Sequence, residues 1–115
     1  MAGGISIHAV DVASGCPAEG LAVEIATTDG TPRIVGGGTL NAHGGLDHPV
    51  AQGAGIIAGA YEVRFQVGDY LRRHGSEHAG FLEVIVFRFV IARPEEHFHL
   101  PLKFTAWGYS LFRGS

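Results

Sequence analysis

The chain has 115 residues, of which 46% are hydrophobic, and it carries a formal net charge of −3. This length suits one domain over residues 1–115, and the slight negative charge argues against nucleic acid and membrane surfaces as partners. A single cysteine, Cys16, rules out an intrachain disulfide and fits a reducing, cytoplasmic setting. The first residues show neither a charged leader nor a long apolar run, so we expect no signal peptide and no transmembrane helix.

The first half of the chain predicts strands joined by glycine-rich turns. Apolar residues alternate over residues 5–11, so Ile5, Ile7 and Ala9 share one face of a strand, while Ser6, His8 and Val10 share the other. Further strands are predicted at 21–28, at 33–41 and, from a weak pattern, at 46–50. The three glycines at 36–38 weaken the third strand or place a bulge in it.

The second half predicts four more strands and one short helix. The strands are expected over residues 60–67, 81–91, 97–105 and 109–113. The helix is expected over residues 70–74, with Gly68-Asp69 as its cap. Eight short strands at this spacing are typical of an all-β sandwich.

Histidines are the main candidates for chemistry. His8 lies on the less apolar face of the first strand, and alternation places His97 and His99 together on one face of a later strand. Such a pair performs acid–base work or binds a metal, but a metal needs a third ligand that the neighbouring glutamates do not supply in the right phase. Pro101 cannot donate a ladder hydrogen bond, so we expect this strand to be an edge strand or to carry a bulge.

The C-terminal segment is the other distinctive feature. Residues 109–115 form a strand with two aromatic residues that runs to the last residue, which favours packing of the end, for example against another subunit. The alternative is a last strand with a frayed tail. No phosphate-binding loop, dinucleotide fingerprint or serine-nucleophile motif is present, and Cys16 reads as an incidental thiol.

Four motifs in order resemble the transthyretin-related family, whose enzymes are 5-hydroxyisourate hydrolases. They are Ile7-His8-Ala9-Val10-Asp11 with Ser14-Gly15-Cys16-Pro17-Ala18, Gly59-Ala60-Tyr61-Glu62-Val63, His97-Phe98-His99-Leu100-Pro101-Leu102, and Gly108-Tyr109-Ser110-Leu111-Phe112-Arg113-Gly114-Ser115. The resemblance implies an eight-stranded transthyretin-like (prealbumin) sandwich with one short helix. It also implies a homotetramer, a dimer of dimers with a channel between the dimers.

The resemblance also implies a site in that channel. His8 and His99 would be catalytic, with no metal and no organic cofactor, and would open a lactam ring of a purine-derived substrate by general acid–base catalysis. The substrate-binding residues would be His43, His97, Ser110, Phe112, Arg113, Gly114 and Ser115.

Departures from the family pattern at two places bear on this site, the loop at residues 40–45 and the closing segment. The family has an arginine where this chain has Gly45, and an aspartate where it has His43; either His43 or His48 is a partial substitute if its side chain turns into the channel. Phe112 stands for a tyrosine and Leu111 for a threonine. The changes at Gly45, Phe112 and Leu111 remove polar or charged groups and predict a more apolar channel.

Three functions therefore stay open. The first is a hydrolase of 5-hydroxyisourate or a close analogue. The second is a divergent enzyme of the same fold that opens, closes or rearranges another heterocycle in a specialised biosynthetic pathway. The third is a non-catalytic carrier of a small molecule, a use that does not require the two histidines and the Arg113-Gly114-Ser115 ending together.

Overall fold

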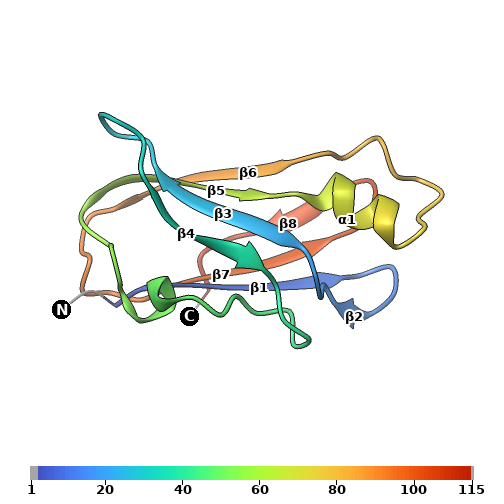
Figure 1. The fold of residues 1–115 in the computed structure, drawn as a ribbon, viewed down its shortest axis with the longest axis horizontal. Coiled ribbons are helices and arrows are strands. Elements are labelled where there is room, and N and C mark those ends of the chain that lie inside the picture. Colours follow the sequence, from blue (N-terminus) through green and yellow to red (C-terminus); the bar gives the residue numbers. More distant parts are fainter. Residues whose placement is uncertain (1–2, 115) are drawn as a thin grey trace.

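Two four-stranded sheets pack face to face in the computed structural model, which describes residues 3–114 (Figure 1). One sheet has the order β2 (Cys16–Pro17), β1 (Ile5–Asp11), β7 (Phe98–Phe104), β8 (Tyr109–Leu111). The other has the order β4 (Ile34–Thr39), β3 (Ala22–Thr27), β5 (Gly59–Phe65), β6 (Ile85–Ile91). A 3₁₀-helix, η1 (Pro49–Gln52), and one α-helix, α1 (Val67–Arg73), complete the described part. The eight-stranded sandwich with one short helix is confirmed.

The core lies between the sheets and follows from period-two alternation. Along β1 every second residue is buried, and Ile5, Ile7 and Ala9 face the core as predicted. The other sheet contributes large side chains such as Tyr61 and Phe65 from β5. The outward face of β1 thereby carries Ser6, His8 and Val10, of which the first two belong to the site described below.

Strand β7 occupies the middle of its sheet, so the prediction of an edge strand is wrong. It pairs in parallel with β1 and antiparallel with β8, whose ladder begins at Leu102↔Leu111. Three residues further along each strand the same register returns as an isolated bridge, His99↔Gly114. Pro101 stands in the gap, where its missing N–H leaves the ladder without a donor. A central strand tolerates this proline because β8 separates from it at that point.

The weak prediction of a strand at 46–50 is also wrong. Pro49 has no N–H for a ladder but suits the first turn of a helix, and the segment forms η1. The Nδ1 atom of His48 accepts a hydrogen bond of 3.0 Å from the Val50 N–H and caps that helix. Of the glycine-rich third strand, only residues 34–39 pair. The three glycines pair in regular register with β3, and the register shift opposite Ile25 and Ala26 skips Val35, so the bulge lies beside the glycines and not among them.

The helix begins before its predicted cap. Val67 is already helical and Gln66 precedes it without a side-chain cap, so the prediction of Gly68-Asp69 as the cap is wrong. The Gly68 N–H donates to the Glu83 carbonyl, and the Asp69 carboxylate pairs with Arg72 at 2.7 Å. Tyr70 packs inward toward the buried Asp11, and burial raises the pKa of Tyr70 to about 12. The contact between Tyr70 and Asp11 holds α1 against the end of β1.

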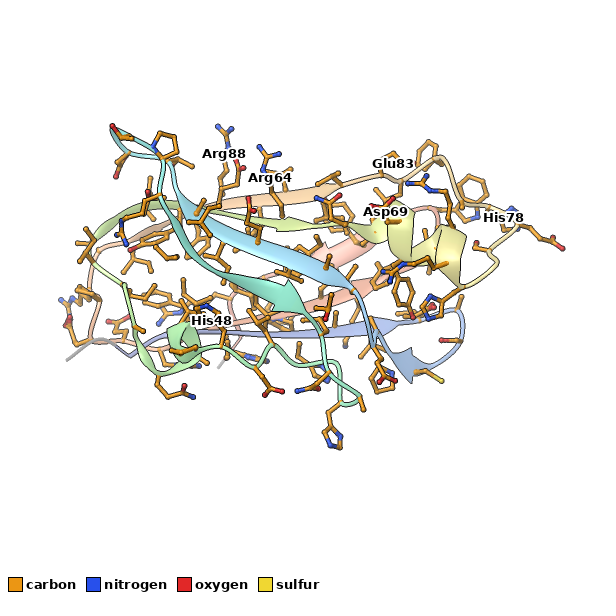
Figure 2. The ribbon with its side chains drawn as sticks, viewed as in Figure 1. His48, Arg64, Asp69, His78, Glu83 and Arg88 are labelled. Carbon is orange, nitrogen blue, oxygen red and sulfur yellow. The ribbon has the colours of Figure 1, made fainter. Side chains whose placement is uncertain are left out.

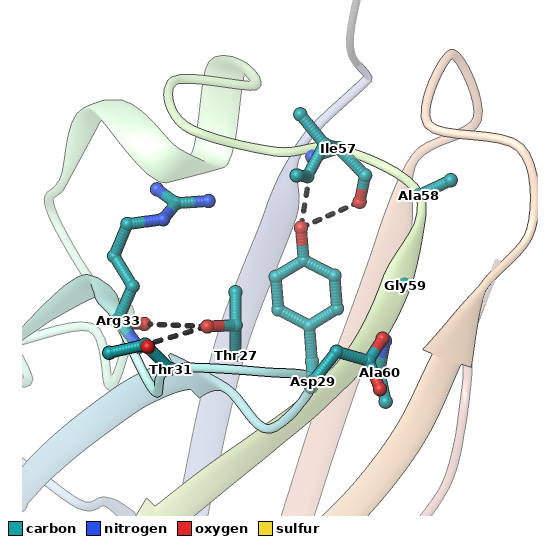
Figure 3. A pocket seen from close by; sticks show the side chains of 9 residues that line it. Thr27, Asp29, Thr31, Arg33, Ile57, Ala58, Gly59 and Ala60 are labelled. Atoms are coloured by element: carbon teal, nitrogen blue, oxygen red, sulfur yellow. Dashed lines mark hydrogen bonds between the residues drawn. The ribbon is translucent and has the colours of Figure 1, made fainter.

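A tyrosine side chain ties the loop before β5 to that strand (Figure 3). Tyr61 lies beside a small cavity of about 140 Å³ that Asp29 and Arg33 also line. Its hydroxyl donates to the Ile57 carbonyl at 2.6 Å and accepts from the Ile57 N–H at 2.9 Å. The polar atoms around this cavity therefore serve to fasten the loop before β5.

Tyr61→Phe is expected to lower the free energy of unfolding by about 1–3 kcal/mol, because it leaves the backbone groups of Ile57 without their partner. Urea unfolding at one protein concentration measures the change. Thr31→Val is the control, since the side chain of Thr31 lines the same cavity, is exposed and makes no hydrogen bond within the described residues. Equal midpoints for the two variants would show that the Tyr61 hydroxyl adds nothing.

Candidate active site

The outer surface of β1, β7 and the segment after Leu111 gathers the residues singled out from the sequence. Paired residues in neighbouring strands share a face, and the pairs here are Ser6↔His99, His8↔Pro101 and Lys103↔Ser110. The register between Leu102↔Leu111 and His99↔Gly114 adds Phe112 opposite Pro101. We call this surface the histidine face; it carries Ser6, His8, His99, Pro101, Lys103, Ser110 and Phe112.

His99 is half-buried at the centre of this face. Its Nδ1 lies 2.7 Å from the Ser6 hydroxyl oxygen. Its backbone carbonyl accepts a hydrogen bond of 2.6 Å from the Gly114 N–H, and a Cβ on Gly114 would lie only 3.1 Å from the imidazole Cδ2. Gly114 therefore lets the C-terminal segment lie directly against the ring. Burial lowers the pKa of His99, and the neighbouring His8 and His97 lower it further.

His8 reaches the same face from β1, with its Cα roughly 8 Å from that of His99 by strand geometry. Its Nε2 lies 2.8 Å from the His43 carbonyl oxygen, which only accepts, so Nε2 carries the proton. In the neutral ring the Nδ1 atom then holds the lone pair. The two histidines thus present different ring nitrogens to the same surface.

The loop beside His8 owes its shape to Asn41. The Asn41 side-chain oxygen accepts from the N–H groups of His43 (2.9 Å) and Gly45 (3.1 Å), which turns the chain so that the His43 carbonyl meets His8. Gly44 has φ of +81°, and a Cβ there would lie 2.6 Å from the Ala9 carbonyl oxygen, so glycine is required. A Cβ on Gly45 would meet ordinary contacts of 3.7 Å or more, and its backbone is not left-handed. The structure therefore tolerates a Cβ at this position.

The contacts of three predicted residues bear on the changes at the site. His43 contacts His8 through its backbone carbonyl, and its exposed imidazole makes no hydrogen bond within the described residues. The Nδ1 atom of His48 caps η1, so this nitrogen is not available to stand in for the arginine (Figure 2). Leu111 pairs with Leu102 and packs against the core, so it does not make the outer face more apolar.

The remaining predicted residues flank the histidines. His97 is exposed, and its two ring nitrogens lie 2.8 Å from the Ser6 hydroxyl and 2.5 Å from the Gly3 carbonyl oxygen. The Arg113 guanidinium lies 4.3 Å over the Phe98 ring and 2.9 Å from a Glu96 carboxylate oxygen. Arg113 thus holds the C-terminal segment down. Ser115 lies outside the described residues.

Ser6 is the residue that sequence reasoning missed. Alternation places it on the same strand face as His8, but nothing in the local pattern distinguishes it from other serines on exposed strand faces. Its hydroxyl contacts both His97 and His99. The pairing of β1 with β7, which brings residues 93 positions apart together, is not readable from local patterns.

A second cluster of charges lies on the opposite sheet and is structural. Arg64 and Arg88 project from the outer side of β5 and β6 (Figure 2), and both pair with the buried Glu62 carboxylate. Hydrogen bonds from these arginines lower the pKa of Glu62. Since both cations are engaged with one carboxylate, this cluster offers no free acid or base, and it explains the glutamate of the Gly59–Val63 motif.

Two absences apply to the described residues 3–114. No group of three histidine, cysteine, aspartate or glutamate side chains is placed to hold a metal ion. No helix in this range has the length and apolar character needed to span a membrane.

Comparison with known proteins gives consistent matches along the whole chain. The model of the HIUase/Transthyretin family matches residues 5–114. The chain is 38% identical to 5-hydroxyisourate hydrolase 2 of Rhizobium meliloti, with 98% of this chain and 97% of that protein covered. It is 37% identical to 5-hydroxyisourate hydrolase of Pseudomonas aeruginosa, with 98% and 92% covered.

Solved structures agree with these matches. The chain resembles (S)-allantoin synthase with a TM-score of 0.88 at 30% identity, covering all of this chain and 46% of that one. It resembles 5-hydroxyisourate hydrolase of Klebsiella pneumoniae with a TM-score of 0.80 at 30% identity, covering 96% and 92%. Transthyretin of Sparus aurata, 24% identical over 97% of each chain, has a TM-score of 0.81 and shows the shared fold.

Proposed function

The chain belongs to the HIUase/transthyretin family, and from this premise we propose that it hydrolyses the lactam ring of 5-hydroxyisourate or a closely similar heterocycle. The observation that carries the proposal is the histidine face, on which His8 and His99 stand side by side with different ring nitrogens available. Relatives named 5-hydroxyisourate hydrolase support the reaction class.

The geometry supports a division of labour between the two imidazoles. The Nε2 atom of His99 accepts a proton from the water that attacks the lactam carbonyl. The carbonyl carbon gains the hydroxyl group, the carbon–nitrogen bond breaks, and the departing nitrogen takes a proton. His8, when it carries a second proton on Nδ1, is the donor for that nitrogen. One water is consumed, and neither a metal nor an organic cofactor enters the scheme.

Stabilisation of the developing oxyanion is the weaker part of this site. The family arginine is replaced by Gly45, and the Arg113 guanidinium is engaged with Glu96. On the described part of the histidine face, Lys103 is the cationic side chain that remains. It lies four residues from His99, so the two Cα atoms are roughly 13 Å apart along the strand. We therefore propose that protonated His8 supplies the local positive charge and that the rate lies below that of an enzyme with the arginine.

We also propose that the working form is a homotetramer whose channel is lined by the histidine face. In one chain this face is open to water, and the side chain of Phe112 on it is 50% exposed. An exposed aromatic side chain on such a face favours an interface between subunits. Apposition of two such faces would also shield the histidines from bulk water, apart from the one molecule that the reaction consumes.

The pH dependence follows from the lowered pKa of His99. The base form of a histidine is lost as the pH falls through its pKa, so lowering that pKa extends activity into more acid solution. We expect the acid limb of the kcat/KM profile to have its midpoint below the ordinary histidine value of about 6.5. Initial rates between pH 5 and 8 measure it, with buffer-only decay subtracted at each pH. A midpoint at or above 6.5 would contradict His99 as the base.

The lack of a cationic side chain at Gly45 favours a second candidate, a divergent enzyme that acts on a different and more apolar heterocycle. Phe112, half exposed on the same face, adds apolar surface where the family has a tyrosine. A panel of cyclic amides followed by mass spectrometry separates the candidates. Gain of one water by 5-hydroxyisourate alone supports the first, and conversion of another ring supports the second. Tight binding without conversion would instead indicate a carrier.

A further inference from the structure

A continuous hydrogen-bonded chain runs from the backbone through two histidines to the open side of the histidine face. The Nδ1 atom of His97 lies 2.5 Å from the Gly3 carbonyl oxygen, and its Nε2 lies 2.8 Å from the Ser6 hydroxyl oxygen. The same hydroxyl oxygen lies 2.7 Å from Nδ1 of His99. These distances are in the range of good hydrogen bonds. Ser6 is the single link between the two imidazoles.

The first member of the chain fixes the direction of the bonds that follow. A backbone carbonyl oxygen only accepts, so Nδ1 of His97 carries a proton and donates. In a neutral His97 the Nε2 atom is then an acceptor, and the Ser6 hydroxyl must donate its one proton to it. The Ser6 oxygen is left to accept from Nδ1 of His99. The proton of neutral His99 therefore resides on Nδ1, and the lone pair is on Nε2.

We infer that Ser6 and His97 are positioning residues that hold His99 in its Nδ1–H tautomer, so that its Nε2 faces the substrate side as a base. The assignment of tautomers follows from the structure, whereas its catalytic meaning rests on the proposed function. A histidine tautomer is commonly set by the bond that its other nitrogen makes. Here that bond comes from a relay of two side chains, neither of which touches the substrate in this account.

Further features of His99 fit this arrangement. The Gly114 backbone lies against the edge of the His99 ring near Cδ2, which restricts rotation of the ring away from Ser6. Burial and the two neighbouring histidines lower the pKa of His99, which favours the neutral ring that the relay requires. Within residues 3–114 the Nε2 atom of His99 makes no hydrogen bond, so it is available to a water molecule or a substrate.

The test compares Ser6→Val with Ser6→Thr, two variants of equal branching that differ in the hydroxyl group. Both residues suit a strand, so the pair separates loss of the hydroxyl from a change in shape. The primary readout is the ¹⁵N spectrum of the imidazoles in full-length protein at pH 8, where histidine side chains are in general neutral. Protonated and unprotonated ring nitrogens differ widely in chemical shift, so the tautomer of His99 is observed directly. His99→Gln identifies its signals.

We expect the natural protein and Ser6→Thr to show His99 with a protonated Nδ1, and Ser6→Val to shift it toward the Nε2–H form. A His99 that is Nε2–H in the natural protein, or that keeps its tautomer in Ser6→Val, would overturn the inference. Equal thermal midpoints and equal elution volumes for the two variants serve as the control for folding and assembly.

The kinetic readout is separate from the spectroscopic one. With 5-hydroxyisourate as substrate, Ser6→Val should lower kcat about 10- to 100-fold with little change in KM, and Ser6→Thr should restore most of it. If the natural protein shows the predicted tautomer but no turnover, the proposed function fails while the relay stands. If turnover is present but unaffected by Ser6→Val, the positioning role fails while the hydrolase stands.

Discussion

Replacing His99 with alanine is expected to lower kcat for 5-hydroxyisourate at least 100-fold. A positioned general base contributes roughly 10²- to 10⁴-fold to such a reaction, and within the histidine face the Nε2 atom of His99 is the base that the surrounding contacts hold in place. Stopped-flow absorbance with freshly generated substrate measures the loss. His8→Ala should cause a comparable loss, because the proposed proton donor is removed.

His43→Ala is the matched control for both variants. It removes an exposed imidazole from the neighbouring loop but keeps the backbone carbonyl that contacts Nε2 of His8. We expect its kcat to stay within about twofold of the natural protein, consistent with a side chain outside the site. Near-normal rates in His8→Ala and His99→Ala together would contradict histidine catalysis. A large loss of kcat in His43→Ala would show that the His43 imidazole takes part in the site.

Gly45→Arg is expected to raise kcat/KM for 5-hydroxyisourate by about 10-fold or more. One donor aimed at a developing oxyanion is worth roughly 10²- to 10³-fold in enzymes that are built around it. The gain here is set lower because the surrounding loop has not adjusted to the guanidinium. The backbone of Gly45 is compatible with a side chain, and the nearest atoms to a new Cβ belong to Asn41 and the Ile7 carbonyl. The same assay provides the measurement.

Gly45→Gln separates charge from bulk, since it adds a long polar side chain without a cation. We expect Gly45→Gln to leave the rate unchanged or lower it. Equal gains in both variants would show that filling the space matters and that charge does not. A loss of activity in Gly45→Arg with the fold intact would favour the second candidate, a site that acts on a different substrate without a cation at this position.

Alternation in the sequence predicted most of the strands and their buried faces, because burial on one side of a strand imposes a period of two. It placed His8 opposite the core on β1 and His99 opposite Phe98 on β7, and the structure agrees. It did not determine strand order. Pro101 indicated an edge strand, but β8 leaves a gap at that residue, so a central position is compatible with the missing N–H.

Local patterns failed where the conformation depends on side-chain capping and close approach. The segment over residues 42–58 is shaped by Asn41 and His48, whose side chains satisfy backbone N–H groups two to four residues away. Such turns leave no periodic signal. The role of Ser6 was hidden for a different reason, because it depends on the parallel pairing of two strands that lie far apart in the chain.

The motifs that identified the family do not all belong to the site. Of the Gly59–Val63 motif, Tyr61 fastens a loop, and Glu62 forms ion pairs with two arginines on the sheet opposite the histidine face. Arg113 of the closing motif packs over Phe98 and brings Gly114 against His99. The resemblance therefore reflects structural requirements as much as chemistry, which is why the change at Gly45 needs its own experiment.

The measurement that tests the central claim most directly follows the ultraviolet absorbance of freshly generated 5-hydroxyisourate with the natural protein, with His99→Ala and with buffer alone. The proposed hydrolase predicts faster decay with the natural protein and decay close to the buffer rate with His99→Ala. Decay at the buffer rate in all three samples would contradict the hydrolase and show that the site without its arginine serves another ring or only binds a ligand.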